Sequence, residues 1–275
     1  MIERYQGRQI VDTHIHMHEP FRDAQTVVDY LDKNHVDVGR VLARPLKEGE
    51  GSKTEHMPGI QRLYLKGPNN WAPARFATEF FIGPYARKMA AEELDNQRVI
   101  TAAKERPDRL LAWMFIKPGD DMQTFDAIQA AMTSGEFNAA GIKMHFWIFP
   151  TDVMNESVIQ AAELARATNT PLVMDVGVNR KRMKRFGELA QKYSDVPIIA
   201  AHLGSNLPEI IKAAKENTNV FLDISGYTVT GEHLRDVIKR ISSDKLLYSL
   251  STDPVSRIIF GSDSPGGLGG SIQDS

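Results

Sequence analysis

Val11-Asp12-Thr13-His14-Ile15-His16 opens the ordered pattern of this chain, and it has the character of a buried strand. Successive side chains of a strand point to opposite faces, so His14 and His16 should project from the same face. Two imidazoles on one face form half of a metal site. They can equally be a pair of hydrogen-bonded histidines, so the rest of the chain must distinguish the two interpretations.

The size of the chain favours one large domain. Its 275 residues are close to the roughly 250 residues of an eight-stranded α/β barrel. Hydrophobic residues make up 42% and charged residues 25%, which is ordinary for a globular enzyme and argues against a disordered or fibrous class. The chain has no cysteine, which excludes disulfides, thiolate metal ligands and cysteine nucleophiles.

Charge and hydropathy bear on partners and location. The net charge of -2 gives no overall field that would attract nucleic acid or an anionic membrane. The N-terminus lacks the apolar run of a signal peptide, and no apolar segment approaches the roughly 18 residues of a membrane span. We therefore expect a cytoplasmic protein that acts on a small molecule, without nucleic-acid or membrane partners.

Apolar segments of strand length alternate with segments of helical periodicity along most of the chain. The predicted strands are 11–16, 38–43, 110–116, 140–145, 172–176, 198–202, 220–224 and 257–263. The predicted helices are 23–33, 85–105, 123–133, 153–168, 181–193, 207–216 and 232–241. Eight strands joined by crossover helices most simply close into a (β/α)8 TIM barrel. A doubly wound open sheet is the competing architecture, but no glycine-rich phosphate fingerprint follows the first strand.

Two segments depart from this regular pattern. A long insertion around residues 44–80 is rich in glycine, proline and aromatic residues, and it is interpreted as an active-site cover, a partner contact or a surface excursion. After Asp263 the chain has only a glycine-rich tail with no eighth helix. Either the chain is truncated, or a partner subunit such as a second copy covers that side, or the barrel ends irregularly.

Polar residues gather at the downstream ends of the predicted strands. They are Lys143 and His145 on the fourth strand, Asp175 on the fifth, His202 on the sixth and Asp263 on the eighth. The chemistry of such barrels takes place at the carboxyl ends of the strands. Together with His14 and His16, these residues predict one site that is built from many strands.

Four motifs carry a resemblance to a known family: Val11-Asp12-Thr13-His14-Ile15-His16, Gly141-Ile142-Lys143-Met144-His145, Ala201-His202-Leu203-Gly204 and Ile259-Phe260-Gly261-Ser262-Asp263-Ser264-Pro265. In their order and spacing the chain resembles the amidohydrolase superfamily, in the branch related to aminocarboxymuconate semialdehyde decarboxylase. The resemblance implies a divalent metal, most often zinc, that is bound by His14, His16 and Asp263. It makes His202 a further ligand or an acid/base group. Imidazole and carboxylate are suitable ligands for such an ion.

One position departs from the family pattern. The family usually supplies a histidine from the fifth strand, where this chain has Asp175. Asp175 could bind the ion or contact the substrate, His145 could reach across as a ligand or a supporting residue, or the site could be weakened. Lys143 either holds a substrate carboxylate, or is carboxylated to bridge two metals, or pairs with Asp175. Arg44, which follows the second strand, is a further candidate for substrate binding.

Three functions are compatible with these residues. The leading expectation is a hydrolase in which metal-bound hydroxide attacks an amide or lactone-type bond and Asp263 takes the proton. The second is non-oxidative decarboxylation of an unsaturated or aromatic acid, with Lys143 or Arg44 holding the substrate and His202 handling the proton. The third is a barrel that binds a ligand without turnover, since fold alone does not determine function.

Overall fold

The computed structural model describes residues 9–44, 83–88, 94–177, 179–205, 207–225 and 258–264. Within these residues eight strands form one parallel sheet in which each strand pairs with the next along the chain. The strands are β1 (Val11–Met17), β2 (Val38–Ala43), β3 (Leu110–Phe115), β4 (Ala139–His145), β5 (Leu172–Asp175), β6 (Ile198–Ala200), β7 (Val220–Asp223) and β8 (Ile258–Ile259). The predicted TIM-barrel architecture is confirmed.

The sheet curls until its two ends meet. The backbone N–H of Thr13 donates to the carbonyl oxygen of Phe260 at 3.1 Å, and that of His16 donates to Ser264 at 2.7 Å. Ile15 and Ser264 form a parallel bridge beside them. The start of the chain and the segment after β8 are thereby joined into a nearly closed barrel.

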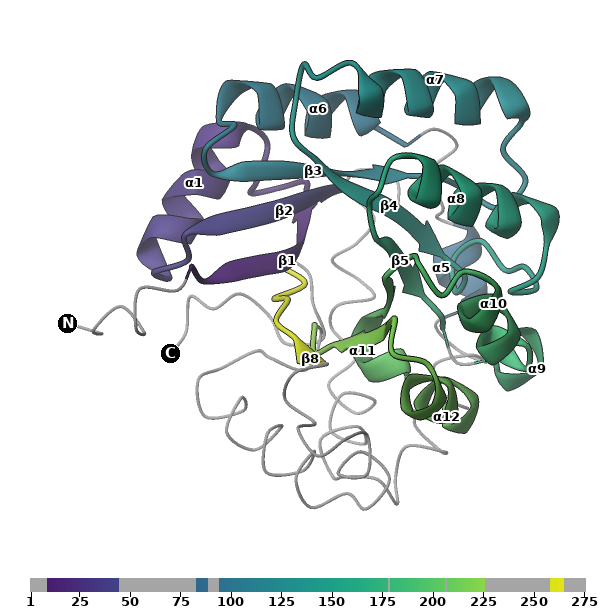
Figure 1. Cartoon of the computed structure of the whole chain (residues 1–275). Helices are drawn as coiled ribbons and strands as arrows, with labels where there is room; N and C mark the ends of the chain where they lie inside the picture. Colours follow the sequence, from purple (N-terminus) through teal and green to yellow (C-terminus); the bar gives the residue numbers. More distant parts are fainter. Residues whose placement is uncertain are drawn as a thin grey trace.

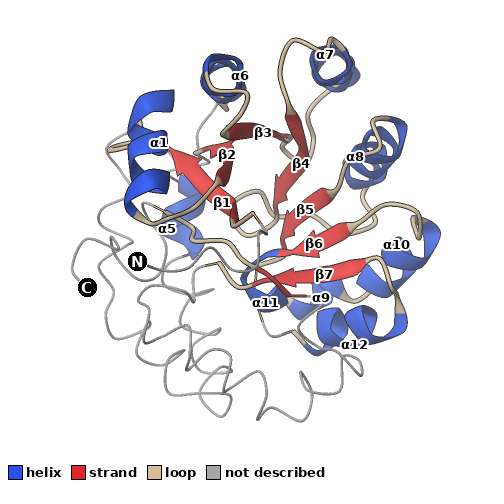
Figure 2. Cartoon of the chain, turned by 60° about the vertical axis from the view of Figure 1, so that its left-hand side comes forward, coloured by secondary structure: helices blue, strands red, loops and turns tan. Residues whose placement is uncertain are grey.

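Helices cover the outside of the strands (Figure 1, Figure 2). They are α1 (Ala24–Lys33), α5 (Gly83–Lys88), α6 (Asn96–Glu105), α7 (Met122–Thr133), α8 (Glu156–Ala167), α9 (Arg180–Met183), α10 (Phe186–Lys192) and α12 (Pro208–Glu216). The short segment α11 (Ala201–Gly204) follows directly after β6 and contains residues with left-handed backbone angles. In α1 the buried residues Ala24, Val27, Val28 and Leu31 recur at helical spacing, which places one apolar stripe against the sheet. None of the described helices has the length and apolar character needed to cross a bilayer.

Two of the predicted helices are interrupted. A continuous helix over 85–105 is wrong, because Leu94 and Asp95 are not helical. The Asp95 side chain instead accepts a hydrogen bond from the backbone N–H of Arg98 and caps α6. A continuous helix over 181–193 is also wrong: Arg185 has φ -100° and ψ 16°, and it separates α9 from α10. In each case non-helical residues that periodicity does not report interrupt the segment.

Several predicted features lie outside the described residues. The long insertion around 44–80 is one of them, except for Arg44 at its start. The helix predicted over 232–241 and the tail after residue 264 are the others.

A β-bulge in β1 separates Asp12 from the two histidines. Asp12 pairs with Gly39 but Ile15 pairs with Val41, so three steps along β1 match two along β2. Asp12 therefore shares the face of Gly39, which lies against Leu31 of α1. There its Oδ1 accepts hydrogen bonds from the backbone N–H of Ser262 at 2.9 Å and of His14 at 3.1 Å.

Asp12 is fully buried, and these two bonds connect β1 with the segment after β8. Asp12→Ala should destabilise the protein by about 2 kcal/mol, because two buried backbone donors lose a charged acceptor. Asp12→Asn keeps an oxygen at the same place and should stay within about 1 kcal/mol of the wild type. Urea unfolding measures both variants, and equal losses in the two would contradict this account.

Position 141 in β4 requires a glycine because of its backbone conformation and its close neighbours. Its φ is 142°, and a Cβ there would overlap the carbonyl oxygen of Pro171 and lie 2.5 Å from Cζ3 of Trp113. Gly141→Ala should therefore cost about 3 kcal/mol or more through strain and overpacking. Gly187 in α10 is the matched control, since a Cβ there meets no atom closer than 3.9 Å. Gly187→Ala should be neutral or slightly stabilising in the same unfolding experiment, and equal losses at both glycines would refute the proposed clash.

Candidate metal centre

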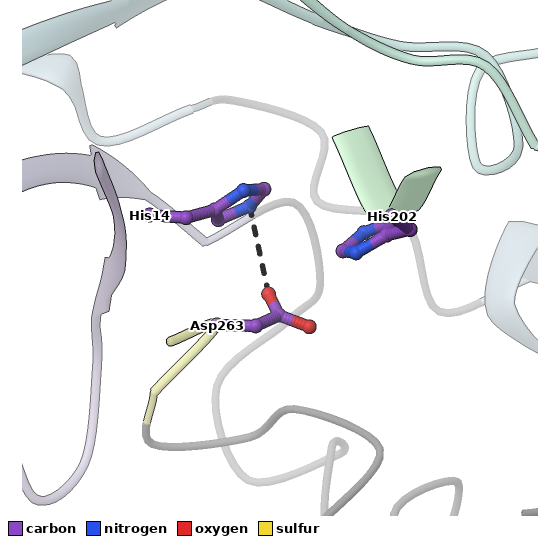
Figure 3. A group of neighbouring side chains, drawn as sticks. All are labelled: His14, His202 and Asp263. Carbon is purple, nitrogen blue, oxygen red and sulfur yellow. Dashed lines mark ion pairs between the residues drawn. The ribbon is translucent and has the colours of Figure 1, made fainter. Parts of the chain in front are cut away.

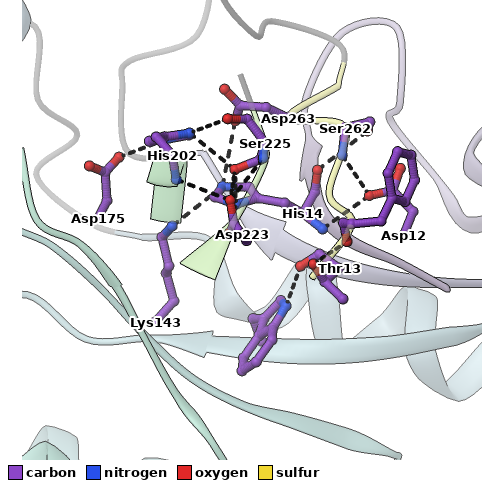
Figure 4. Close-up of polar contacts among 12 residues, drawn as sticks. Asp12, Thr13, His14, Lys143, Asp175, His202, Asp223, Ser225, Ser262 and Asp263 are labelled. Carbon is purple, nitrogen blue, oxygen red and sulfur yellow. Dashed lines mark hydrogen bonds and ion pairs between the residues drawn. The ribbon is translucent and has the colours of Figure 1, made fainter. Parts of the chain in front are cut away.

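The polar residues predicted at the strand ends come together at one end of the barrel. Figure 4 shows five of them: His14, Lys143, Asp175, His202 and Asp263. β1 carries His14 and His16, β4 carries Lys143 and His145, β5 ends at Asp175, and His202 and Asp263 follow β6 and β8. This is the carboxyl end of the strands, where the active sites of such barrels lie.

Asp263 lies against both histidines of β1. Its Oδ1 is 3.5 Å from Nε2 of His14 and 3.3 Å from Nε2 of His16. The two imidazole rings are 5.3 Å apart, as expected for side chains that share one face. One donor atom each from His14, His202 and Asp263 lies within 4.8 Å of the others, so a single ion could contact all three (Figure 3).

The backbone conformation at Asp263 directs its carboxylate toward β1. The strand predicted over 257–263 is wrong beyond Ile259, where β8 ends. Asp263 has φ 61°, a left-handed conformation that aspartate tolerates better than most residues. Its backbone N–H donates to the carbonyl oxygen of His14 at 2.8 Å, which holds the turn against β1.

His202 is not on a strand, contrary to the prediction for 198–202. β6 ends at Ala200, and His202 begins a turn in which its own φ is 56° and that of Leu203 is 52°. Nδ1 of His202 lies 2.9 Å from the carbonyl oxygen of Ser225, and Nε2 lies 3.1 Å from Oδ2 of Asp175. Both ring nitrogens therefore face acceptors.

Asp175, which stands where the family has a histidine, is shared between two histidines. Its Oδ2 contacts Nε2 of His145 at 3.0 Å as well as His202. Nδ1 of His145 accepts the backbone N–H of Ile148 at 3.3 Å, so both of its ring nitrogens are already bonded. Its ring also stacks on Trp147. His145 thus contacts Asp175, the carboxylate that also contacts His202.

Lys143 is fully buried, and its Nζ lies 3.3 Å from Nε2 of His14. It thus contacts a histidine rather than forming the direct ion pair with Asp175 that the sequence allowed. Burial lowers the pKa of Lys143, although the negative charges of Asp175 and Asp263 oppose this.

The charges of the site are suited to a divalent cation. Burial and the charge of Lys143 lower the pKa of His14 to about 4, so its imidazole is neutral at pH 7. Burial alone would raise the pKa of Asp263, but His202 and His16 hold it well below its ordinary value. A neutral imidazole beside a carboxylate is the donor set that zinc and similar ions prefer.

His202 has the opposite charge tendency. Burial would lower its pKa, but the carboxylates of Asp175 and Asp263 outweigh burial and raise the pKa to about 10. His202 therefore carries a proton at neutral pH when no cation is bound.

Arg44 follows β2 and contributes positive charge at the edge of the site. Burial and, next in size, the charge of Arg44 lower the pKa of His18 to about 3. His18 is buried, and its ring lies 6.4 Å from that of His16. Arg44 is thus near the side of the metal centre formed by β1.

Two contributors to the site are absent from the residues singled out in the sequence. Asp223 and Ser225, at and after the end of β7, are buried and bonded to both His14 and His202. Asp223 is the polar residue of the otherwise apolar segment Val220–Ile224, which is the pattern that marked Asp175 and Asp263. That pattern was sufficient to find it.

Comparison with known proteins agrees with this geometry. The amidohydrolase family profile matches residues 11–271. No curated protein matches the chain.

Solved structures share the fold at low sequence identity. A probable 2-pyrone-4,6-dicarboxylic acid hydrolase from Acinetobacter baumannii, with citric acid bound, has a TM-score of 0.56 and 13% identity over 94% of this chain and 85% of that chain. The 5-carboxyvanillate decarboxylase of Novosphingobium aromaticivorans, with manganese and 4-hydroxy-3-methoxy-5-nitrobenzoic acid, has a TM-score of 0.57 and 13% identity over 96% and 88%. For 2,6-dihydroxybenzoate decarboxylase from Rhizobium the values are 0.55 and 13% over 94% and 90%.

The family profile extends over nearly the whole chain, and the barrel and its histidines agree with it. This protein is a member of the amidohydrolase family.

Proposed function

We propose that the protein is a metal-dependent hydrolase that cleaves an amide or lactone-type bond in a small carboxylate substrate. The observation that carries the proposal is that Oδ1 of Asp263 lies 3.5 Å from Nε2 of His14 and 3.3 Å from Nε2 of His16 at the catalytic end of the barrel. A bound divalent ion, which we take to be zinc, supplies Lewis acidity and makes a water molecule nucleophilic near pH 7.

His14, His16 and Asp263 would hold the ion, because Asp263 lies within 3.5 Å of both imidazoles. The second carboxylate oxygen of Asp263 is then available to accept a proton from the attacking water. We assign His202 to protonating the leaving group rather than to the ion. Both of its ring nitrogens face acceptors, so Nε2 carries a hydrogen toward Asp175 instead of offering a lone pair.

The substrate is proposed to be an anion. Lys143 lies directly beside His14 inside the site, and Arg44 adds positive charge at its edge. Two of the structurally similar proteins contain bound carboxylates, citric acid in one and a nitrobenzoic acid in the other. Asp175 is bonded to two histidines, so we assign it to holding His202 rather than to binding substrate.

Non-oxidative decarboxylation of an aromatic or unsaturated acid is the second candidate. The specific observation in its favour is that buried Lys143 and protonated His202 both lie beside His14. In that reaction Lys143 or Arg44 would hold the carboxylate, and His202 would deliver a proton to the carbon that loses carbon dioxide.

Metal dependence and reaction type can be tested together. The protein, stripped with a chelator and reloaded with zinc or manganese, is offered a panel of carboxylated lactones and amides and a panel of aromatic acids. We expect hydrolysis by the reloaded protein only, with about one zinc per chain by elemental analysis. Release of carbon dioxide would instead establish the decarboxylase, and binding without any turnover would establish a ligand-binding barrel.

The ligand set is checked in the same experiment. His14→Ala should weaken metal binding by more than about 100-fold, since it removes a ligand rather than a supporting contact. The matched control is His35→Asn, because His35 is exposed at the opposite end of the barrel, just before β2. Asparagine also tolerates the φ of 57° at that position. Equal metal affinity in the two variants would remove His14 from the ligand set.

The acid role of His202 predicts a separation of metal binding from turnover. His202→Asn should reduce kcat by about 10²–10⁴-fold, the usual range for a proton-transfer group. Its metal affinity should stay within a few fold of the wild type. A parallel loss of metal content would show that His202 is a ligand instead. Competition with a chromophoric chelator measures the affinity, and initial rates measure kcat.

A further inference from the structure

Asp223 is the most highly connected buried group of the site that has no assigned role. It ends β7 and is 1% exposed, and both of its carboxylate oxygens are bonded. Oδ2 lies 3.2 Å from Nδ1 of His14. Oδ1 accepts the backbone N–H of His202 at 3.0 Å and that of Ser225 at 2.9 Å, and also the hydroxyl of Ser225. One carboxylate thereby joins β1, the turn after β6 and the end of β7.

The contact with His14 determines which ring nitrogen carries the hydrogen. A carboxylate can only accept, so Nδ1 must donate and a neutral ring then has its lone pair on Nε2. The Ser225 hydroxyl, which gives its hydrogen to Asp223, also faces Nδ1 as an acceptor. Nε2 is the nitrogen that faces Asp263 and Lys143. Asp223 therefore leaves the lone pair of His14 at the place where an ion would be held.

The contact with His202 holds a strained backbone. His202, Leu203, Gly204 and Ser205 all have positive φ, between 50° and 59°. A left-handed conformation is unfavourable for each of these residues other than glycine. At the start of the turn Asp223 accepts a hydrogen bond from the backbone N–H of His202. At its end the backbone N–H of Ser205 donates to the carbonyl oxygen of His202 at 2.9 Å.

We propose that Asp223 is a positioning residue that serves both histidines: it sets the Nδ1–H tautomer of His14 and fixes the backbone that presents His202. The positioning role of Asp223 does not depend on the proposed function. Only its consequence for catalysis rests on that function, in which His14 is a metal ligand and His202 is an acid. Asp223 is not itself among the donor atoms that gather around a possible ion within the described residues.

Asp223→Asn separates the two effects. Three donors at the Oδ1 side keep the amide oxygen there, so the new NH2 group faces Nδ1 of His14. Two donors cannot face each other, and the ring hydrogen should move to Nε2, where Asp263 can accept it. The backbone bond to His202 is retained in this variant. Asp223→Ala loses both contacts.

The tautomer is measured on the metal-free protein with 15N-labelled histidine at pH 8, by NMR correlations through two and three bonds. The resonances of His14 are assigned from their disappearance in His14→Gln. We expect Nδ1–H in the wild type and Nε2–H in Asp223→Asn. An unchanged tautomer in Asp223→Asn would overturn the proposal. It would indicate that Lys143, which contacts Nε2 of His14, sets the tautomer instead.

Two further readouts keep the test decisive. Zinc affinity of Asp223→Asn should fall by about 10–100-fold, as for other groups that orient a ligating histidine. The amide hydrogen of His202 should exchange faster in Asp223→Ala than in Asp223→Asn. If Asp223→Asn does not fold, the wild-type spectrum still decides, because Nε2–H on His14 would refute the assignment. A shifted tautomer in a protein that binds no metal would reject the proposed function and leave the positioning role in place.

Discussion

Pairing between β1 and residues 260–264 is the contact on which the site depends. The backbone bonds from Thr13 to Phe260 and from His16 to Ser264 close the barrel. Because they also set the register, they bring Asp263 beside the two histidines although these lie near opposite ends of the chain. Asp12, which the bulge turns away from the barrel interior, adds two buried hydrogen bonds to this junction.

Burial is the main cost of building such a site. Charged groups removed from water are tolerated only when other charges and hydrogen bonds compensate them. Asp223 is held at a pKa of about 2, although burial alone would raise it, because it bonds to His14 and lies near the charge of His202. Lys143 is the exception: burial lowers its pKa, and its near contact is a histidine.

Three irregular backbone features of this protein lie where the chemistry is expected. The left-handed turn at His202, the left-handed Asp263 and the bulge in β1 all lie at or beside the metal centre. Residues in sparsely populated conformations persist only when surrounding contacts hold them, and the regular pairing of the strands provides those contacts here.

Local patterns in the sequence were sufficient to predict the eight strands, the barrel, the shared face of His14 and His16 and the polar residues at the strand ends. The reason is that periodicity and side-chain alternation are properties of short segments. They did not reveal the breaks at Asp95 and Arg185, the bulge beside Asp12 or the turn at His202. Only the tertiary structure decided that Asp175 serves two histidines and that Asp223 joins His14 to His202. The physical reason is that a hydrogen-bond partner is chosen by distance in space, and these partners come from strands far apart in the sequence.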